Sequence, residues 1–285
     1  MASSLSANQK VAVVTGTSSG IGYETSLTLA RNGFLTYATM RNLSKSKNIN
    51  SLVEKEKLPL KIVQLDVTDD GSVKNAMQSI IAEASRIDVL VNNAGYSLSG
   101  AFEDVTIEEL KAQYETNLFG VTRVIQAALP IMRKQKSGII INISSGVVTI
   151  GGFPGGSAYV STKFAIEGLS KSMAYELEPF GIKVVLVEPG VIRTNLGSNI
   201  VAAKKSQDPN SPYSQIMQKM AASFEPLLEN GSSADVVAKV VLSAATSENP
   251  SPKYLAGKDI ETWMEAKRGM SDEEFHNMMK QNFMK

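Results

Sequence analysis

Short apolar segments alternate with helical patterns along most of the chain. The segments are rich in β-branched residues and show no polar alternation, as expected of strands buried on both faces of a parallel sheet. They cover residues 11–14, 34–39, 61–65, 89–91, 139–143 and 183–187. Strands that alternate with helices form right-handed βαβ units, so the sequence predicts an α/β fold with a doubly wound parallel sheet, a Rossmann fold.

Two long helical patterns stand between the later strands, over about 106–136 and 158–178, and Pro130 is expected to kink or end the first. No repeat or low-complexity linker divides the chain. We therefore predict a flexible tail over 1–9 and a single Rossmann-type domain over 10–285. Residues 195–230 break the alternation after a strand and predict a small substrate lid, and about 246–285 form a C-terminal extension.

The composition restricts the chemistry that is open to this chain. It has no cysteine and one histidine, His276, which we interpret as a surface residue. Thiol nucleophiles, thiolate zinc sites and histidine metal clusters are therefore excluded, and we expect no metal. The net charge of +1 shows no excess of basic residues of the kind that binds nucleic acid. Without a signal peptide or an apolar run of about 18 residues, the sequence predicts a cytoplasmic protein with no membrane span.

A glycine-rich loop, Thr-Gly-Thr-Ser-Ser-Gly-Ile-Gly, follows the first predicted strand and precedes a helical pattern. Glycines let the backbone turn sharply and approach a pyrophosphate, and the start of the helix offers free N–H groups and a favourable dipole. The loop therefore predicts a dinucleotide site made by Gly16, Ser18, Ser19, Gly20, Ile21 and Gly22.

Four further motifs follow the later strands or open the next helix. They are Asn92-Asn93-Ala94-Gly95, Ser144-Ser145, Tyr159-Val160-Ser161-Thr162-Lys163 and Pro189-Gly190. With the glycine loop, and in this order, they resemble the short-chain dehydrogenase/reductase family over roughly residues 10–194. The resemblance implies a small-molecule carbonyl or alcohol substrate, a nicotinamide cofactor, and a homodimer or homotetramer.

Tyr159 and Lys163 stand four residues apart in a helical pattern, and therefore on one face. A neighbouring ammonium favours the phenolate, so we expect it, together with the positive charge of a bound nicotinamide, to lower the tyrosine pKa below its ordinary value of about 10. The resemblance implies that Tyr159 is the general acid/base and that Lys163 also binds the nicotinamide ribose. It further implies that Asn117 holds a helix backbone and a water that leads protons to the lysine.

The resemblance also implies a serine that holds the substrate carbonyl, usually thirteen positions before the tyrosine. Gly146 stands at that position here. The Asn-Ile-Ser-Ser string favours Ser145, with a one-residue insertion before Tyr159, and Ser144 is the alternative.

The end of the second predicted strand indicates which cofactor is used. Met40 stands where NAD-dependent relatives carry an acidic residue, and Arg41 follows it. The donor fork of arginine suits the 2′-phosphate, so NADP(H) is favoured over NAD(H). The resemblance implies further cofactor contacts at Asn42, Asp66, Val67, Asn93, Ala94, Gly95, Pro189, Gly190, Ile192 and Thr194. The sequence departs from the family pattern at Glu188, where an asparagine is common.

These motifs together predict an NADP(H)-dependent oxidoreductase that transfers a hydride between nicotinamide and a carbonyl or secondary alcohol of a moderately hydrophobic substrate. Two alternatives remain, a lyase or epimerase on the same fold and a non-enzymatic NADP-binding regulatory protein. The methionines and aromatics of the C-terminal tail suit a subunit contact or an apolar ligand cover, but packing onto the domain is favoured.

Overall fold

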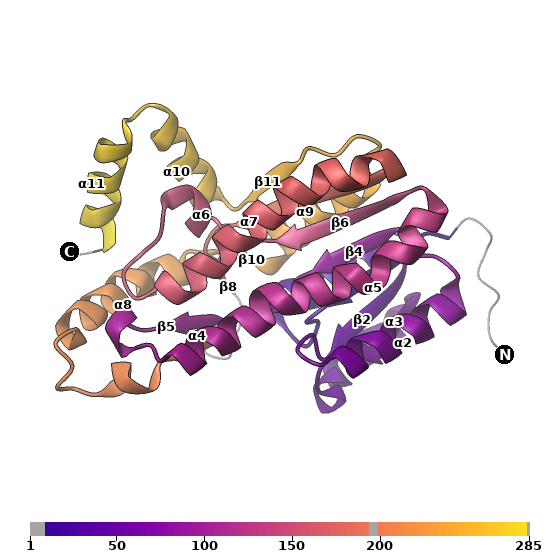
Figure 1. Cartoon of the computed structure of the whole chain (residues 1–285), viewed down its shortest axis with the longest axis horizontal. Coiled ribbons are helices and arrows are strands. Elements are labelled where there is room, and N and C mark those ends of the chain that lie inside the picture. Colours follow the sequence, from indigo (N-terminus) through magenta and orange to yellow (C-terminus); the bar gives the residue numbers. More distant parts are fainter. Residues whose placement is uncertain (1–8, 194–198, 284–285) are drawn as a thin grey trace.

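A seven-stranded parallel sheet forms the centre of the molecule (Figure 1). The computed structural model describes residues 9–193 and 199–283, so the first eight residues of the predicted 1–9 tail, the start of the predicted lid and Thr194 lie outside the described residues. The strand order β11-β7-β6-β4-β1-β2-β3 confirms the doubly wound fold. The strands are β1 (Val11–Thr15), β2 (Leu35–Met40), β3 (Leu60–Gln64), β4 (Val89–Asn92), β6 (Gly138–Ile143), β7 (Ile182–Pro189) and β11 (Lys253–Ala256).

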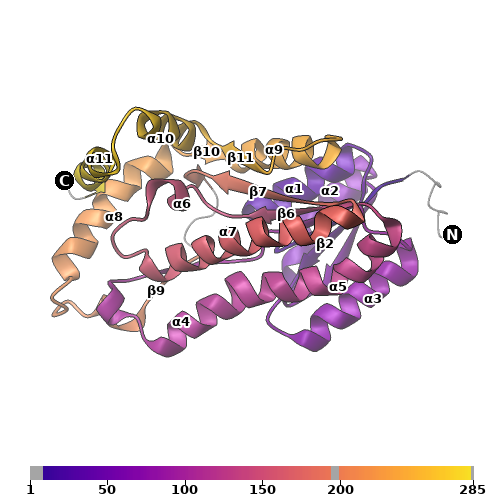
Figure 2. The same ribbon diagram turned by 45° about the horizontal axis from the view of Figure 1, so that its top comes forward.

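Helices cover both faces of this sheet (Figure 2). One face packs against α3 (Asp70–Ala84), α5 (Gly120–Gln135) and α7 (Ser157–Leu177). The other packs against α1 (Gly20–Arg31), α2 (Lys47–Glu56) and α9 (Ala234–Thr246). Residues 158–178 were predicted to be helical, and α7 confirms this to within a residue at each end.

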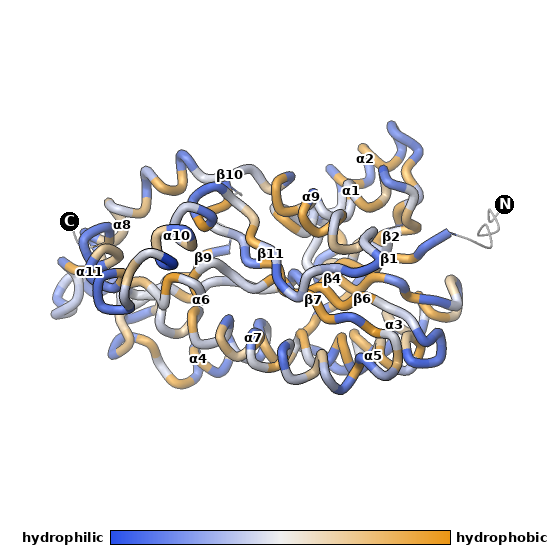
Figure 3. Tube along the Cα trace, turned by 90° about the horizontal axis from the view of Figure 1, so that it is seen from above, coloured by the Kyte–Doolittle hydropathy of each residue, from blue (hydrophilic) through white to orange (hydrophobic). Residues whose placement is uncertain are grey.

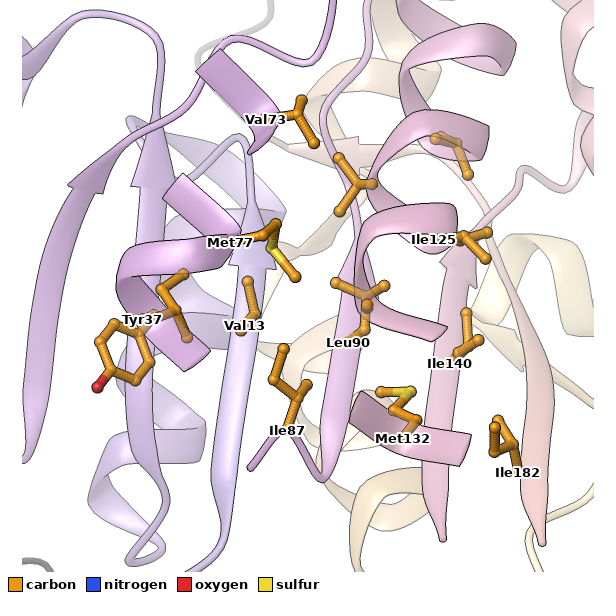
Figure 4. Close-up of a cluster of buried hydrophobic side chains, with 14 of the residues drawn as sticks. Val13, Tyr37, Val73, Met77, Ile87, Leu90, Ile125, Met132, Ile140 and Ile182 are labelled. Atoms are coloured by element: carbon orange, nitrogen blue, oxygen red, sulfur yellow. The ribbon is translucent and has the colours of Figure 1, made fainter. Parts of the chain in front are cut away.

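The core follows the alternation of side chains along each strand. Val13 and Leu90 point to the α3–α5 face, where they pack with Met77 and Ile125 (Figure 4). Ala12 and Val14, which flank Val13 in β1, point to the opposite face, toward α9. In Figure 3 the hydrophobic residues accordingly gather along the strands, whereas the helices alternate between hydrophobic and hydrophilic faces. Burial of both sheet faces explains why these strands were legible in the sequence.

The predicted helix over 106–136 is divided, although Pro130 does not divide it. Helix α4 (Ile107–Tyr114) leads into a π-helical turn (Glu115–Phe119), and α5 then runs through Pro130 to Gln135. Pro130 was expected to kink or end the helix, and the helix does not end there. Pro130 and Gln126, whose carbonyl loses its helical partner, are both exposed, so water can satisfy that carbonyl.

The remaining elements gather beyond the carboxyl ends of the strands (Figure 1). They are β5 (Ser97–Ser99), α6 (Val147–Ile150), β8 (Ile192–Arg193), β9 (Ile200–Ala202), α8 (Ser214–Glu229), β10 (Ser232–Ser233), α10 (Lys258–Arg268) and α11 (Asp272–Phe283). Within the described ranges, no helix has both the length and the apolar character to cross a bilayer.

Candidate active site

The loop after β1 is shaped so that only glycine fits at its turning points. Gly16 and Gly20 have φ angles of +71° and +63°, in the left-handed region where side chains cause strain. A Cβ atom on Gly16 would lie 2.7 Å from the Ala94 Cα atom, and one on Gly22 would lie 2.4 Å from the Gly16 carbonyl oxygen. The backbone of this loop is therefore bare, as close approach of a pyrophosphate requires.

Helix α1 begins within this loop and keeps its first N–H groups available. Ser19 precedes the helix in an extended conformation, and no side chain among the described residues caps it. Ser18 and Ile21 lie half-buried in the same turn. Free N–H groups and the positive end of the helix dipole favour an anion at this place. The predicted loop residues thus fit the diphosphate of a dinucleotide.

The turn after β4 is tied to the glycine loop by hydrogen bonds. The Asn93 Nδ2 atom donates to the carbonyl oxygens of Thr15 (2.9 Å) and Gly16 (3.1 Å). The Thr15 hydroxyl in turn accepts from the backbone N–H groups of Asn93 and Ala94, each at 3.0 Å. The Asn93 side chain and the Thr15 hydroxyl therefore hold the glycine loop and the turn after β4 together.

The end of β2 lies beside the same loop, because the Thr17 N–H donates to the Thr39 carbonyl oxygen at 3.0 Å. Met40 is buried, whereas Arg41 is exposed and forms no ion pair within residues 9–193 and 199–283. The neighbouring Asn42 accepts from the Ser44 N–H at 2.9 Å and so begins the next turn. Arg41 thus follows a strand that is hydrogen-bonded to the glycine loop, and its role toward a 2′-phosphate stays a prediction.

The turn after β3 holds Asp66 and Val67, both of which were predicted to contact the cofactor. The Asp66 Oδ1 atom accepts from the N–H (3.0 Å) and the hydroxyl (2.7 Å) of Thr68, which fixes the half-buried carboxylate. Val67 is buried against Gly120, where a Cβ atom would lie 2.8 Å from Val67 Cγ2. Asp66 therefore stands rigidly at the sheet edge that the other motifs share.

Tyr159, Lys163 and Ser145 come together at the carboxyl end of β6. The Lys163 Nζ atom donates to the Ile143 carbonyl oxygen at 2.8 Å and lies 5.6 Å from the centre of the Tyr159 ring. The Ser145 side chain lies close enough to the Tyr159 phenol to favour its ionised form. Ser144, the alternative, is buried with no partner for its hydroxyl among the described residues. Of the two serines, Ser145 is the one placed to share an acceptor with Tyr159.

Burial sets the ionisation of both groups. It raises the pKa of Tyr159 above its ordinary value, and the nearby Ser145 side chain opposes this rise only in part. In the protein without a cofactor, loss of solvation therefore dominates the pKa of Tyr159. The lowering expected from Lys163 together with a positive nicotinamide stays a prediction for the complex. Burial likewise lowers the pKa of Lys163 to about 8, against the opposing charge of Glu167.

Asn117 lies in the π-helical turn, and its side chain braces the connection after β4. Its Nδ2 atom donates to the Tyr96 carbonyl oxygen (2.9 Å) and to the Thr162 hydroxyl (3.2 Å), and its Oδ1 atom accepts from the Tyr96 N–H (3.1 Å). It thus holds an irregular segment and the residue next to Lys163, instead of the helix backbone that was expected. Its part in proton transfer stays a prediction.

The carboxyl end of β7 contains a buried carboxylate, Glu188, in an ion pair that the sequence analysis did not predict. The Glu188 side chain is fully buried, accepts from the Thr149 hydroxyl at 2.6 Å and pairs with the Lys253 ammonium at 2.9 Å. An acid within an apolar strand was a sign that a partner was needed, but β11, which carries Lys253, had not been recognised. Pro189 accepts from the Gly146 N–H at 2.7 Å, and Gly190 and Ile192 follow at the same sheet edge.

The predicted residues therefore converge on one edge of the sheet. The loops after β1, β2, β3 and β4 form a cradle for a dinucleotide, and those after β6 and β7 carry a buried lysine, a phenol and a hydroxyl. Ligands of doubly wound folds bind outside the carboxyl ends of the strands. A phenol and a hydroxyl that face one point can polarise and protonate a carbonyl oxygen.

Comparisons with known proteins agree with this geometry. The family model described as short chain dehydrogenase matches residues 10–205. The uncharacterized oxidoreductase YusZ of Bacillus subtilis is 38% identical over 89% of this chain and 91% of its own length. Bovine retinol dehydrogenase 8 is 33% identical over 85% and 79%.

Solved structures give the same result for the fold. A short-chain dehydrogenase from Streptomyces avermitilis superposes with a TM-score of 0.82 and 32% identity, covering 97% of this chain and 98% of its own. An alcohol dehydrogenase from the archaeon Thermococcus sibiricus, complexed with 5-hydroxy-NADP, gives a TM-score of 0.71 at 25% identity over 87% and 96%. On its sequence and its fold, this chain belongs to the short-chain dehydrogenase/reductase family of oxidoreductases.

Proposed function

We propose that the protein is an NADP(H)-dependent oxidoreductase acting on a carbonyl or secondary alcohol of a moderately hydrophobic substrate. A bound nicotinamide supplies or accepts the hydride. The observation that carries the proposal is the convergence of Ser145, Tyr159 and Lys163 beside the bare glycine loop. The apolar side chains of α8 and the name of the retinol dehydrogenase relative support the class of substrate.

The chain's own residues divide the remaining work. Ser145 and Tyr159 would hold the substrate oxygen between them, and Tyr159 would give it a proton during reduction. Lys163, held by the Ile143 carbonyl, would place a positive charge beside the phenolate that this transfer leaves. Asn117 would keep Thr162, and with it the start of α7, in position.

A direct test mixes the purified protein with NADPH or NADH and a panel of carbonyl compounds. We expect NADPH to be consumed as the corresponding alcohol appears. Conversion of a substrate with no net use of NADPH would instead indicate a lyase or an epimerase. Binding of NADPH with no conversion of any compound would indicate a regulatory binding protein.

Arg41 tests the choice of cofactor. Charge-assisted hydrogen bonds contribute about 1.5–3 kcal/mol, so Arg41→Ala should weaken NADPH binding by roughly 10–100-fold and leave NADH binding unchanged. Lys45→Ala, which removes a nearby exposed cation, is the control. Fluorescence titration of both cofactors gives the constants. An equal loss for NADH and NADPH, or tighter binding of NADH by the native protein, would contradict the proposal.

The pKa of Lys163 predicts how reduction depends on pH. The lysine is charged below about 8 and loses its proton above that value, whereas the raised pKa of Tyr159 keeps the phenol protonated across the same range. Reduction should therefore slow as the pH rises through about 8, because the cation that favours phenolate formation is lost. In Lys163→Arg the fall should move to higher pH, since arginine stays charged. A value of kcat/KM that stays constant from pH 7 to about 9 would contradict a role for the charged form of Lys163.

A further inference from the structure

The C-terminal residues form an aromatic cluster around Phe283. Its ring centre lies 6.4 Å from that of Phe153, 6.2 Å from that of Phe224 and 6.5 Å from that of Trp263, and Phe153 and Phe224 lie 5.6 Å apart. Phe283 is only 2% exposed although it ends the last helix. Rings at these separations attract one another beyond the apolar area they bury. The part of the last helix that ends at Phe283 is therefore anchored in the molecule.

The cluster joins three elements that lie far apart in the sequence. Phe153 belongs to the loop between α6 and α7, six residues before Tyr159, Phe224 lies on α8 and Trp263 lies on α10. Helix α11 packs on α8, and α10 packs on α6 (Figures 1 and 2). Phe283 is the residue whose ring contacts all three elements. Its loss would therefore loosen each of them from the others.

Two of these elements, α8 and the loop over 151–156, meet just before the start of α7, which carries Tyr159 in its first turn. The loop over 151–156 is held on one side by the Gly100 N–H, which donates to the Gly155 carbonyl oxygen at 2.9 Å. On the other side α8 is packed so tightly that a Cβ atom on Gly155 would lie 2.8 Å from the Met217 sulfur. Phe153 and Met217 are both partly exposed, so each is available to a ligand. Phe153 and Met217 thus form an apolar wall at the segment that leads into the helix of Tyr159.

We propose that Phe283 is a specificity-determining residue that fixes α8 against the 151–156 loop, so that this wall selects carbonyl compounds with a long apolar chain. The proposal rests on the proposed function for the reaction, although substrate binding can be measured without turnover. The loops after β1 to β4, which supply most of the predicted cofactor contacts, contribute no residue to the cluster. Loss of Phe283 should therefore change substrate selection and leave cofactor affinity as it is.

The only tryptophan of the chain, Trp263, reports on this cluster directly. Emission titrations of the NADPH-loaded protein with decan-2-one and butan-2-one measure binding of a long and a short ketone. The native protein should bind decan-2-one at least tenfold more tightly. In Phe283→Ala this preference should fall at least fivefold, and acrylamide should quench Trp263 at least twice as strongly. NADPH affinity should stay within twofold.

Two further variants make the result decisive. Phe283→Leu keeps an apolar side chain and should retain an intermediate preference, and it carries the test if Phe283→Ala fails to fold. Phe180→Ala removes a 40% exposed phenylalanine at the far end of α7 and should change nothing. An equal affinity of the native protein for the two ketones, or an unchanged preference in both Phe283 variants, would overturn the inference. Absence of NADPH oxidation with intact selective binding would instead contradict the proposed function alone.

Discussion

Replacing Tyr159 by phenylalanine is expected to lower kcat for carbonyl reduction by about 10²–10⁴-fold, the contribution typical of a positioned general acid. The change removes the hydroxyl that Ser145 contacts and keeps the ring that lies beside the Lys163 ammonium. The packing at the start of α7 should therefore persist. NADPH affinity and the melting temperature should stay close to those of the native protein.

Rapid-mixing measurement of NADPH oxidation at saturating substrate separates this loss of chemistry from a loss of binding. Tyr175→Phe is the matched control, because Tyr175 lies on the same helix with 79% of its surface exposed. It should react at the native rate. A Tyr159→Phe protein that reacts within a few-fold of the native rate would show that another group delivers the proton.

Replacing Lys253 by methionine is expected to lower the free energy of unfolding at neutral pH by about 2 kcal/mol. Removal of one partner of a buried ion pair costs about 3–5 kcal/mol, and the loss is smaller here because the Lys253 side chain is 38% exposed and partly solvated. The cost arises because Glu188, fully buried, would keep only the hydroxyl of Thr149 as a partner.

This loss should depend on pH in a definite direction. Burial already raises the pKa of Glu188, so the folded protein holds that proton more tightly than the unfolded chain does. Stability contributed by this group therefore falls as the pH rises above the ordinary glutamate range, and removal of Lys253 should steepen the fall. Urea unfolding should show a smaller loss near pH 5 than near pH 8.

Lys239→Met provides the comparison for this prediction. Its ammonium pairs with Asp235 at 2.8 Å, one helical turn away, and both side chains are exposed. Such surface pairs contribute about 0.3–0.5 kcal/mol, so the control should lose little at either pH. Equal losses for the two variants would mean that Glu188 is not the group left without a partner.

The sequence predicted the parts of the fold that depend on short-range patterns. Strands such as 139–143 were legible because both of their faces are buried, and the motifs at strand ends follow directly from that assignment. Because parallel strands share one edge, Tyr159 and the glycine loop could be placed together before their contacts were known. The C-terminal tail was also expected to pack onto the domain, and its aromatic cluster confirms this.

What the sequence did not reveal depends on partners far along the chain. Strand β11 has four residues and begins with a lysine, so no apolar run marks it, and its partner Glu188 stands 65 positions earlier. The direction of the Tyr159 pKa depends on how much burial its neighbours impose, which spacing alone does not give. The expected end of the helix at Pro130 considered only the local loss of a hydrogen bond. The helix continues because Pro130 is exposed, so that water can satisfy the carbonyl left without a partner.

The pairing of α1 with α9 has a consequence for how the protein is made. Leu29 of α1, with Ala12 and Val14 of β1, is covered by Val237 and Val241 of α9, more than two hundred positions later in the chain. Contacts of such long sequence separation form slowly, and synthesis proceeds from the N-terminus. The apolar face beneath the glycine loop therefore stays open until α9 has left the ribosome. The cofactor-binding half is synthesised first and yet depends on one of the last elements to become stable.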